Sequence, residues 1–334
     1  MTQGDGRAEG QAAVDGSTVG DLGVDERSRA ARRTRRKRSN DAQSRKLVAG
    51  VLAALFGGAF WGLSGTCASY LFDVCHLDTM WLLAVRQLAA GALFMIVILT
   101  TDRARFGKLL HNPRHLGTMA VFTFLGIFAN QLFYLVAVRM TNAGTATVLQ
   151  CLQLVLIMGY TCIRSRRAPR PREVAGLVLA FGGSFLIATG GDPTVLVIPP
   201  LGLAMGLLSA VAAACISIIP VKILPEYGSS IVTGSAMFCS GIVTSLFVQP
   251  WKSVPALDGT GWMALAVLIV IGSFLAYMLY MQGVKDIGSV RASLIGTVEP
   301  VSATITSALF LGTVFAPTDI IGFICIIVMV FLTV

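Results

Sequence analysis

The stretch IGSVRASLIGTVEPVSATITSALF, residues 287–310, is long enough to cross a lipid bilayer and is mostly apolar. It nevertheless carries Glu299 and Pro300 near its middle. A carboxylate at membrane depth is costly unless it is paired or hydrated. Pro300 has no N–H, so the carbonyl of Gly296 loses its helical partner and the helix is expected to kink. Because irregular backbone at that depth occurs only where it is buried in protein or lines a cavity, this stretch predicts that the rest of the chain encloses a cavity.

The composition is that of a membrane protein. Of 334 residues, 55% are hydrophobic and only 13% are charged, whereas a soluble domain has about 25% charged residues. The net charge of +9 comes from clusters beside apolar segments, so no nucleic-acid partner is expected. The sequence has no HExxH or Walker A motif, and its three histidines fall in predicted loops. We therefore expect no cofactor, no metal site, no catalytic residues and no enzyme activity.

Ten apolar segments follow a polar N-terminal region, and each is near the roughly 20 residues that a membrane-spanning helix needs. They are residues 48–72, 79–100, 116–138, 142–163, 173–191, 200–221, 229–250, 260–283, 287–310 and 316–334. Residues 1–46 contain too few apolar side chains to fold and are predicted to be a disordered basic tail. The sequence thus predicts an all-α polytopic membrane protein with ten transmembrane helices.

Basic residues mark one side of the membrane. Residues 1–46 hold 11 of the 26 lysines and arginines, and 22 fall on the side of the N-terminus. The opposite side has Arg139 and Lys252. Because basic loops stay in the cytoplasm, both termini are expected to be cytoplasmic and the protein to lie in the cell membrane. The arginines of the tail either anchor this topology or bind anionic lipid headgroups.

An internal similarity divides the chain into two halves. LFYLVAVRMTNAGTATVLQ (132–150) resembles LAYMLYMQGVKDIGSVRASL (275–294): each has an L-x-Y, a tight polar turn and a small-residue entry into the next span. The match pairs spans 3 and 4 with spans 8 and 9, which gives five-helix repeats over residues 47–191 and 192–334. Because five is odd, the halves enter the membrane from opposite sides, as in the inverted repeats of secondary transporters.

The chain resembles the EamA-type, ten-helix class of the drug/metabolite transporter superfamily. The resemblance rests on GGAFWGLSGTCASYLF (57–72), MWLLAVRQLAAGALF (80–94), EVAGLVLAFGGSFLIATG (173–190) and VEPVSATITSALFLG (298–312). It implies ten helices, cytoplasmic termini and alternating-access transport of small metabolites. The family typically has an acidic residue after the Leu-Gly that follows the ninth helix, but here Thr313 follows Leu311-Gly312.

Polar and aromatic residues deep in the spans are the candidates for binding a substrate or lining its cavity. They are Trp61, Ser64, Arg86, Gln131, Tyr134, Gln150, Gln153, Tyr277 and Glu299, and Asn130 and Tyr280 belong to the same spans. Three roles are open for Glu299: a proton or cation site, a counter-charge for a substrate amine, or a structural partner of other groups. Three are also open for Arg86: it binds a substrate carboxylate, it pairs with Glu299, or its side chain snorkels to the outer headgroups. Buried amides either line a cavity or bond between helices.

This set of residues favours a transporter that is not driven by ATP and that moves a small metabolite, such as an amino acid or a related compound. The expected partners are that small-molecule substrate and the lipid bilayer. Two other classes remain open. One is a structural or receptor-like membrane protein that transports nothing, and the other is an integral membrane enzyme.

Overall fold

The computed structural model describes residues 18–168, 170–192, 198–296 and 298–333, which are helical and contain no strand. The first half of the chain has α1 (Thr18–Asp73), α2 (Thr79–Thr101), α3 (Arg103–Leu110), α4 (Pro113–Val121), the π-helix η1 (Phe122–Phe128), α5 (Ala129–Met140), α6 (Ala143–Gln150), α7 (Gln153–Arg164) and α8 (Pro171–Thr189). The second half has α9 (Pro200–Ile218), η2 (Ile219–Lys222), α10 (Leu224–Tyr227), α11 (Ser229–Val248), α12 (Gly259–Ile269), the π-helix η3 (Val270–Leu275), α13 (Ala276–Ile287), α14 (Ser289–Gly296), α15 (Val298–Leu311) and α16 (Pro317–Thr333).

Eight continuous or nearly continuous helical segments are long and apolar enough to cross a membrane. They are Ser44–Asp73, Thr79–Thr101, Pro113–Met140, Ala143–Arg164, Pro200–Lys222, Ser229–Val248, Gly259–Ile287 and Arg291–Leu311. The apolar helices α8 and α16 are shorter and fall at the fifth and tenth positions. The predicted order of ten apolar helices in an all-α membrane protein is therefore confirmed over the described residues.

The chain divides into residues 1–47 and a compact unit, Val48–Val334. Helix α1 begins at Thr18, so the part of the predicted disordered tail that the structure describes is helical rather than irregular. Residues 1–17 lie outside the described residues. No proline interrupts residues 18–47, and the eight arginines there are good helix formers, which favours a helix although apolar residues are scarce.

Polar caps set the helix starts within the compact unit. The side chain of Asp78 accepts a hydrogen bond from the backbone N–H of Trp81 at 2.9 Å, and that of Asn142 accepts one from Thr145 at 2.8 Å. These bonds satisfy backbone donors that have no partner inside the first helical turn. Gly288, at φ +86°, ends α13 in a conformation that other residues rarely adopt.

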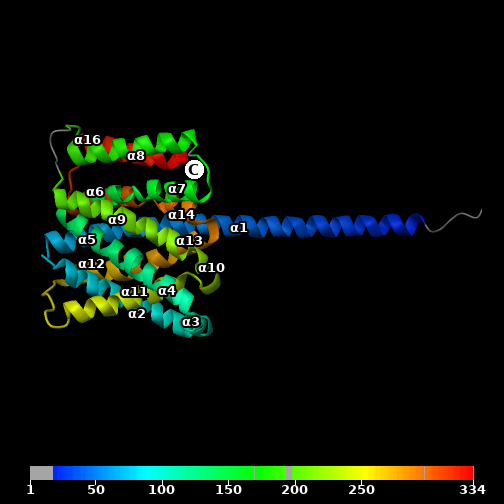
Figure 1. Ribbon diagram of the computed structural model, residues 1–334, viewed down its shortest axis with the longest axis horizontal. Helices are drawn as coiled ribbons and strands as arrows, with labels where there is room; N and C mark the ends of the chain where they lie inside the picture. Colours follow the sequence, from blue (N-terminus) through cyan, green and yellow to red (C-terminus); the bar gives the residue numbers. More distant parts are fainter. Residues whose placement is uncertain (1–17, 169, 193–197, 297, 334) are drawn as a thin grey trace, which may run out of the picture. The chain divides into compact units, whose positions relative to one another are not determined.

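Helices of the first half pack against helices of the second half. The pairs are α2 with α11, α5 with α9, α6 with α15 and α8 with α16, and Figure 1 shows α8 and α16 side by side. Close approach of α2 and α11 depends on Gly91 and Gly241, where an added Cβ would lie 2.5 Å from backbone atoms of the facing helix. The interior is thus built at the contact between the halves.

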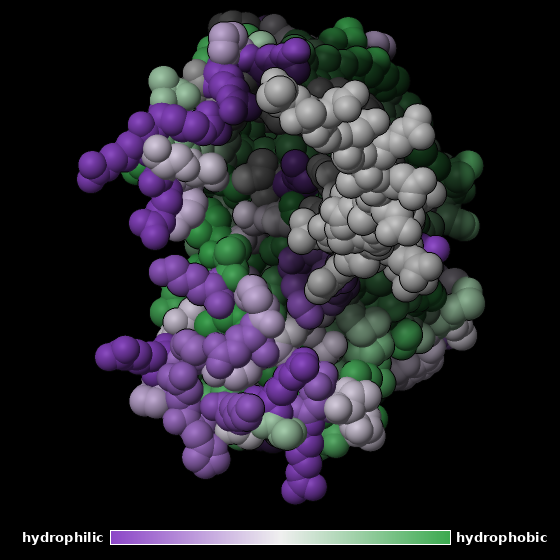
Figure 2. Space-filling model, turned by 90° about the vertical axis from the view of Figure 1, so that its right-hand side faces the viewer, coloured by the Kyte–Doolittle hydropathy of each residue, from purple (hydrophilic) through white to green (hydrophobic). Residues whose placement is uncertain are grey.

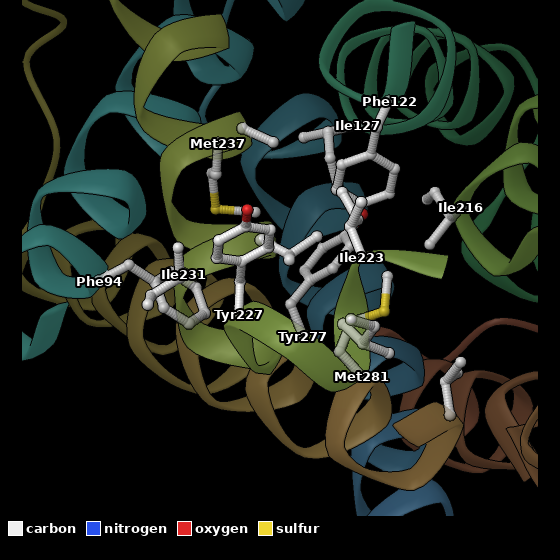
Figure 3. Packing of buried hydrophobic residues seen from close by; sticks show 14 of the residues in the cluster. Phe94, Phe122, Ile127, Ile216, Ile223, Tyr227, Ile231, Met237, Tyr277 and Met281 are labelled. Carbon is white, nitrogen blue, oxygen red and sulfur yellow. The ribbon is translucent and has the colours of Figure 1, made fainter. Parts of the chain in front are cut away.

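An apolar cluster fills part of this contact. Figure 3 shows Phe122 of η1, Ile216 of α9, and Tyr277 and Met281 of α13 among the buried residues of this cluster. All four belong to one continuous cluster of buried residues. Its members come from both halves, so apolar burial stabilises the contact between them.

Hydrophilic side chains gather at one end of the compact unit. Figure 2 shows them on the face at the right-hand end of Figure 1, where α3 and α10 lie. Exposed basic residues at this end include Arg103, Arg105, Lys108, Lys222 and Lys285. Loops that are predicted to lie on the same side of the membrane as the N-terminus are therefore found together at this end.

Candidate functional site

Helix α1 crosses the interior and touches helices of both halves. Gly62 faces the backbone of Glu299, and Gly65 faces the hydroxyl of Tyr134, so closely that a Cβ at either position would collide with these groups. Trp61 directly precedes Gly62, and its ring packs on the rings of Tyr277 and Tyr280, with ring centroids 4.8 and 4.6 Å apart. The glycines of this helix are needed for close packing, as small residues are in membrane helices generally.

Arg86 is held by an irregular turn of another helix. Its Nε donates a hydrogen bond to the Ser273 hydroxyl at 2.6 Å, and its Nη2 donates a longer one to the Gly272 carbonyl at 3.5 Å. Both acceptors belong to the π-helix η3, where Ser273 also donates to the Leu268 carbonyl, five residues back, at 2.9 Å. The wider turn leaves a carbonyl for Arg86, in line with the frequent occurrence of π-bulges at functional sites.

These contacts decide between the alternatives for Arg86. The side chain is only 3% exposed, so it does not snorkel to the surface. No ion pair within 4.0 Å joins it to Glu299, although both residues are described. Its Nη1 has no hydrogen-bond partner within the described part of the chain. A cation therefore lies deep among the helices with one donor unused, which is costly without a ligand or water.

The third helix of each half contributes polar groups just after a π-helix. Asn130, Gln131 and Tyr134 follow η1, and Tyr277 and Tyr280 follow η3. Gln150 Nε2 donates to Asn130 Oδ1 at 2.6 Å, and Asn130 Nδ2 donates to the Tyr277 hydroxyl at 3.4 Å. This chain of bonds joins three helices and both halves.

The fourth helix of the first half is interrupted at the pocket, because α6 ends at Gln150 and α7 begins at Gln153. In the second half, α14 and α15 lie on either side of residue 297, which is outside the described residues. The irregularity expected before Pro300 therefore stays a prediction. Gln153 begins α7, and Glu299 is the second residue of α15. Glu299 is buried, with 8% of its surface exposed.

A hydroxyl cluster joins three helices beside Tyr280. The Tyr280 hydroxyl lies 3.0 Å from Ser217 Oγ and 3.0 Å from Ser293 Oγ, and the two serine oxygens are 3.1 Å apart. Ser217 belongs to α9 and Ser293 to α14. Of the three, Tyr280 lines the pocket described below.

These residues surround one pocket with about 450 Å³ of space outside protein atoms. Its lining residues are Trp61, Arg86, Asn130, Gln131, Tyr134, Gln150, Gln153, Ala213, Ile216, Tyr277, Tyr280 and Glu299. The centre of a water molecule can reach only about 30 Å³ of it, which is room for about two waters. Side chains must therefore move before a larger solute can bind.

Eight of the nine predicted residues line this pocket, and Ser64 does not. Gly272 has no side chain, and Ser64 occupies the space where its Cβ would be. Ser64 therefore packs behind the turn that holds Arg86. Asn130 and Tyr280 line the pocket although they were not among the nine. Ala213 and Ile216 carry no polar signal, so nothing in the sequence distinguishes them from other apolar residues of their span.

The helical architecture and the buried polar pocket between two halves are typical of membrane transporters. The chain belongs to the EamA-like transporter family, whose model matches residues 48–189 and 200–334. It is thus a multi-pass membrane protein of a transporter family, in agreement with the resemblance found in the sequence.

Proteins of similar sequence support the assignment of the chain to this family. The chain is 31% identical over 273 residues to the uncharacterized inner membrane transporter YicL of Salmonella typhimurium, covering 82% of this chain and 91% of the relative. It is 25% identical over 245 residues to the uncharacterized transporter YyaM of Bacillus subtilis, covering 71% and 78%. A solved crystal structure with 17% identity has a TM-score of 0.59 and covers 84% of this chain and 95% of its own, which shows a shared fold.

Proposed function

We propose that the protein is a secondary transporter that moves a small metabolite, such as an amino acid or a related compound, across the cytoplasmic membrane without ATP. The observation that carries the proposal is the pocket itself. Deep among the helices it combines Arg86, Glu299, four amides and four aromatic rings. A purely structural core would satisfy such groups internally, because buried unpaired polar atoms are costly. Here Trp61 Nε1, Arg86 Nη1 and the Tyr134 hydroxyl have no hydrogen-bond partner among the described residues.

The proposed mechanism is alternating access. The pocket lies where the two halves meet, and the third helix of each half contains a π-helix beside it. Rocking of one half against the other would open the pocket to one side and then to the other. On the side of the basic loops, opening requires that the hydrogen bonds among Ser217, Tyr280 and Ser293 break.

The direct test is flux in proteoliposomes. Purified protein would be reconstituted and supplied with a panel of radiolabelled metabolites that includes the twenty L-amino acids, with and without an imposed pH gradient. We expect saturable uptake of at least one compound above that of protein-free liposomes. Solute binding with no flux for any compound would favour a receptor-like protein, and neither binding nor flux would favour a structural one.

We further propose that both termini are cytoplasmic and that the basic tail contacts anionic headgroups. The concentration of 11 basic residues within residues 1–46 supports both statements. Reporter fusions at each terminus test the orientation. A synthetic peptide of residues 1–46 tests the lipid contact: it is expected to bind vesicles containing phosphatidylglycerol but not vesicles of phosphatidylcholine. Equal binding to both would leave the tail as a topology anchor.

A further inference from the structure

We propose that a groove between α6, α15 and α16 binds one acyl chain of a membrane phospholipid, and that this chain supports α15 from the side away from the polar pocket. The groove has a volume of about 190 Å³, whereas the polar pocket measured in the same way has about 30 Å³. This inference goes beyond the proposed function, because it requires neither a substrate nor flux.

The lining of the groove is apolar. It consists of Val148 of α6, of Pro300, Val301, Thr304 and Ile305 of α15, and of four apolar residues of α16. Thr304 has the only polar side chain in this lining, and its hydroxyl donates a hydrogen bond to the Pro300 carbonyl of its own helix at 2.7 Å. A charged or strongly polar ligand would lose its hydration here without compensation. Apolar cavities of about this size stay dry and bind apolar molecules.

The groove exists because α16 packs closely on only some of its neighbours. Its packing is extensive against α8 and slight against α14, and Figure 1 shows the pair α8 and α16 at the edge of the compact unit. Phe323 of α16 borders the groove, and its ring packs edge-on against that of Phe315 with centroids 5.4 Å apart. Phe315 in turn lies against Gly144 of α6. This aromatic contact fixes α16 to α6, while the space between α16 and α15 stays unfilled.

The surroundings of the groove identify its occupant. Helices α6 and α15 belong to segments that are long and apolar enough to cross the membrane. Ile305, Ile320 and Ile324 form the open flank of the groove and are 53%, 49% and 53% exposed. In a membrane protein such an apolar flank faces acyl chains rather than water. An unfilled space between helices forfeits dispersion contacts, and an acyl chain that enters from the flank restores them.

The volume of the groove argues against a second copy of the chain as the occupant. One helical turn, about 5 Å long and about 10 Å across, fills roughly 400 Å³. The groove has about half of that volume, so a helix does not fit without moving α16. An acyl chain is narrower and flexible, and it fits the space as it stands.

Helix α15 separates the groove from the polar pocket. Glu299 lines the polar pocket, and the next residue, Pro300, lines the groove. Another side of the helix is held by α1, because Ser302 Oγ donates a hydrogen bond to the Ala59 carbonyl at 2.8 Å. The groove is therefore the side toward which α15 can yield. An acyl chain in it keeps the helix that carries Glu299 in the observed position.

The test is photolabelling of the full-length protein in detergent with a phosphatidylglycerol that carries a diazirine in the middle of one acyl chain. Mass spectrometry locates the adducts. We expect labelling of the groove residues to saturate with lipid concentration and to exceed labelling at Leu246 by about 5-fold or more. Leu246 of α11 is 62% exposed and represents ordinary lipid contact. A phosphatidylcholine with the same chains is expected to label equally well, because the groove binds the chain and not the headgroup.

Two variants change the groove in different ways. Val301→Phe fills it, and Ile324→Trp blocks its open flank and covers the case in which the first variant fails to fold. Each is expected to lower groove labelling to the level at position 246. Each is also expected to remove most of the rise in melting temperature that added phospholipid gives the wild type, since a ligand of the folded state stabilises it. Leu246→Phe, a similar enlargement on a lipid-facing helix surface, is expected to keep both effects.

Two results would overturn the inference. One is groove labelling no higher than that at Leu246 in the wild type, and the other is equal groove labelling in the wild type and both variants. An unlabelled groove in a protein that migrates as a dimer would overturn it too and would assign this face to a second copy. Failure of the proposed function is separate, because it would show as absence of flux for every metabolite and would leave the lipid labelling unchanged.

Discussion

Gln153 and Glu299 occupy equivalent places in the two halves of the molecule. Gln153 is the first residue of α7 and Glu299 is the second residue of α15, in the fourth helix of each half. Their local sequences, Gln-Leu-Val and Glu-Pro-Val, correspond residue by residue. Both side chains line the same pocket. At this pair of positions the first half presents an amide and the second half a carboxylic acid to the pocket.

Changing Glu299 to Gln makes this pair of residues identical and removes that charge. If Glu299 takes up and releases a proton during transport, the variant loses the response of flux to an imposed pH gradient, because an amide does not titrate in this range. The measurement is uptake in proteoliposomes with and without the gradient. Asp286→Asn, which neutralises an exposed acid outside the pocket, is the matched control. A Glu299→Gln protein with wild-type flux and wild-type pH response would rule out a proton site here.

The contact between α1 and α15 leads to a prediction about stability. An added Cβ at Gly62 would lie 2.5 Å from the Glu299 carbonyl oxygen and 2.7 Å from the Ala303 nitrogen. Because backbone atoms cannot move aside cheaply, we expect Gly62→Ala to lower the unfolding free energy by about 1–3 kcal/mol and to disturb ligand binding. The melting temperature in detergent measures the first effect.

Gly117 provides the control for this change. It lies in helix α4, and an added Cβ there would meet nothing within 4 Å. Gly117→Ala is expected to be neutral or to stabilise by up to about 1 kcal/mol, since alanine favours helix more than glycine does. Equal melting temperatures for the two variants would contradict the close approach of α1 and α15.

The anchoring of Arg86 can be tested through Ser273. Replacing Ser273 by Ala removes the acceptor for Nε and leaves a buried charged donor unpaired, which costs about 1–3 kcal/mol. We expect a lower melting temperature together with weaker binding of a carboxylate-bearing substrate. Ser235→Ala is the control, because the Ser235 hydroxyl donates to Ile231 in its own helix. If both variants bind substrate equally well, Arg86 does not depend on the π-helix for its position.

Much of the fold follows from the sequence because bilayer thickness fixes helix length. Runs of apolar residues predicted ten helices in the observed order, and Glu299-Pro300 predicted an irregular point in the ninth. The two π-helices were not predicted. Their segments, Phe122–Phe128 and Val270–Leu275, are apolar runs whose composition is the same for an α-helix and for the wider π-helix. The interruption after Gln150 contains no proline, so no local signal marks it.

The candidate site could be predicted at positions where a polar residue stands inside an apolar span, because such a residue is rare in a membrane helix. Arg86, Glu299 and the glutamines are rare in membrane helices, and they meet at one pocket. Ser64 was misplaced because a serine is small enough to pack against Gly272 behind the π-turn, so its polarity alone does not point to a cavity. The partner of Arg86 could not be predicted, because Ser273 becomes available only through the π-turn.

The hydroxyl cluster of Ser217, Tyr280 and Ser293 leads to a prediction about conformational equilibrium. These bonds join α9, α13 and α14, and in the proposed alternating-access mechanism they break when the pocket opens toward the basic loops. Ser293→Ala removes two of them. Each is worth about 0.5–1.5 kcal/mol, so the variant is expected to increase the population open on that side by about 5-fold or more.

The measurement is the rate at which a cysteine introduced at Ala213, in a background without the native cysteines, reacts with a water-soluble thiol reagent. Ser209→Ala is the control, because its hydroxyl donates only to Gly206 in its own helix at 2.7 Å. Faster labelling in Ser293→Ala than in Ser209→Ala would identify the cluster as the closed gate, whereas equal rates would mean that the pocket opens by another route.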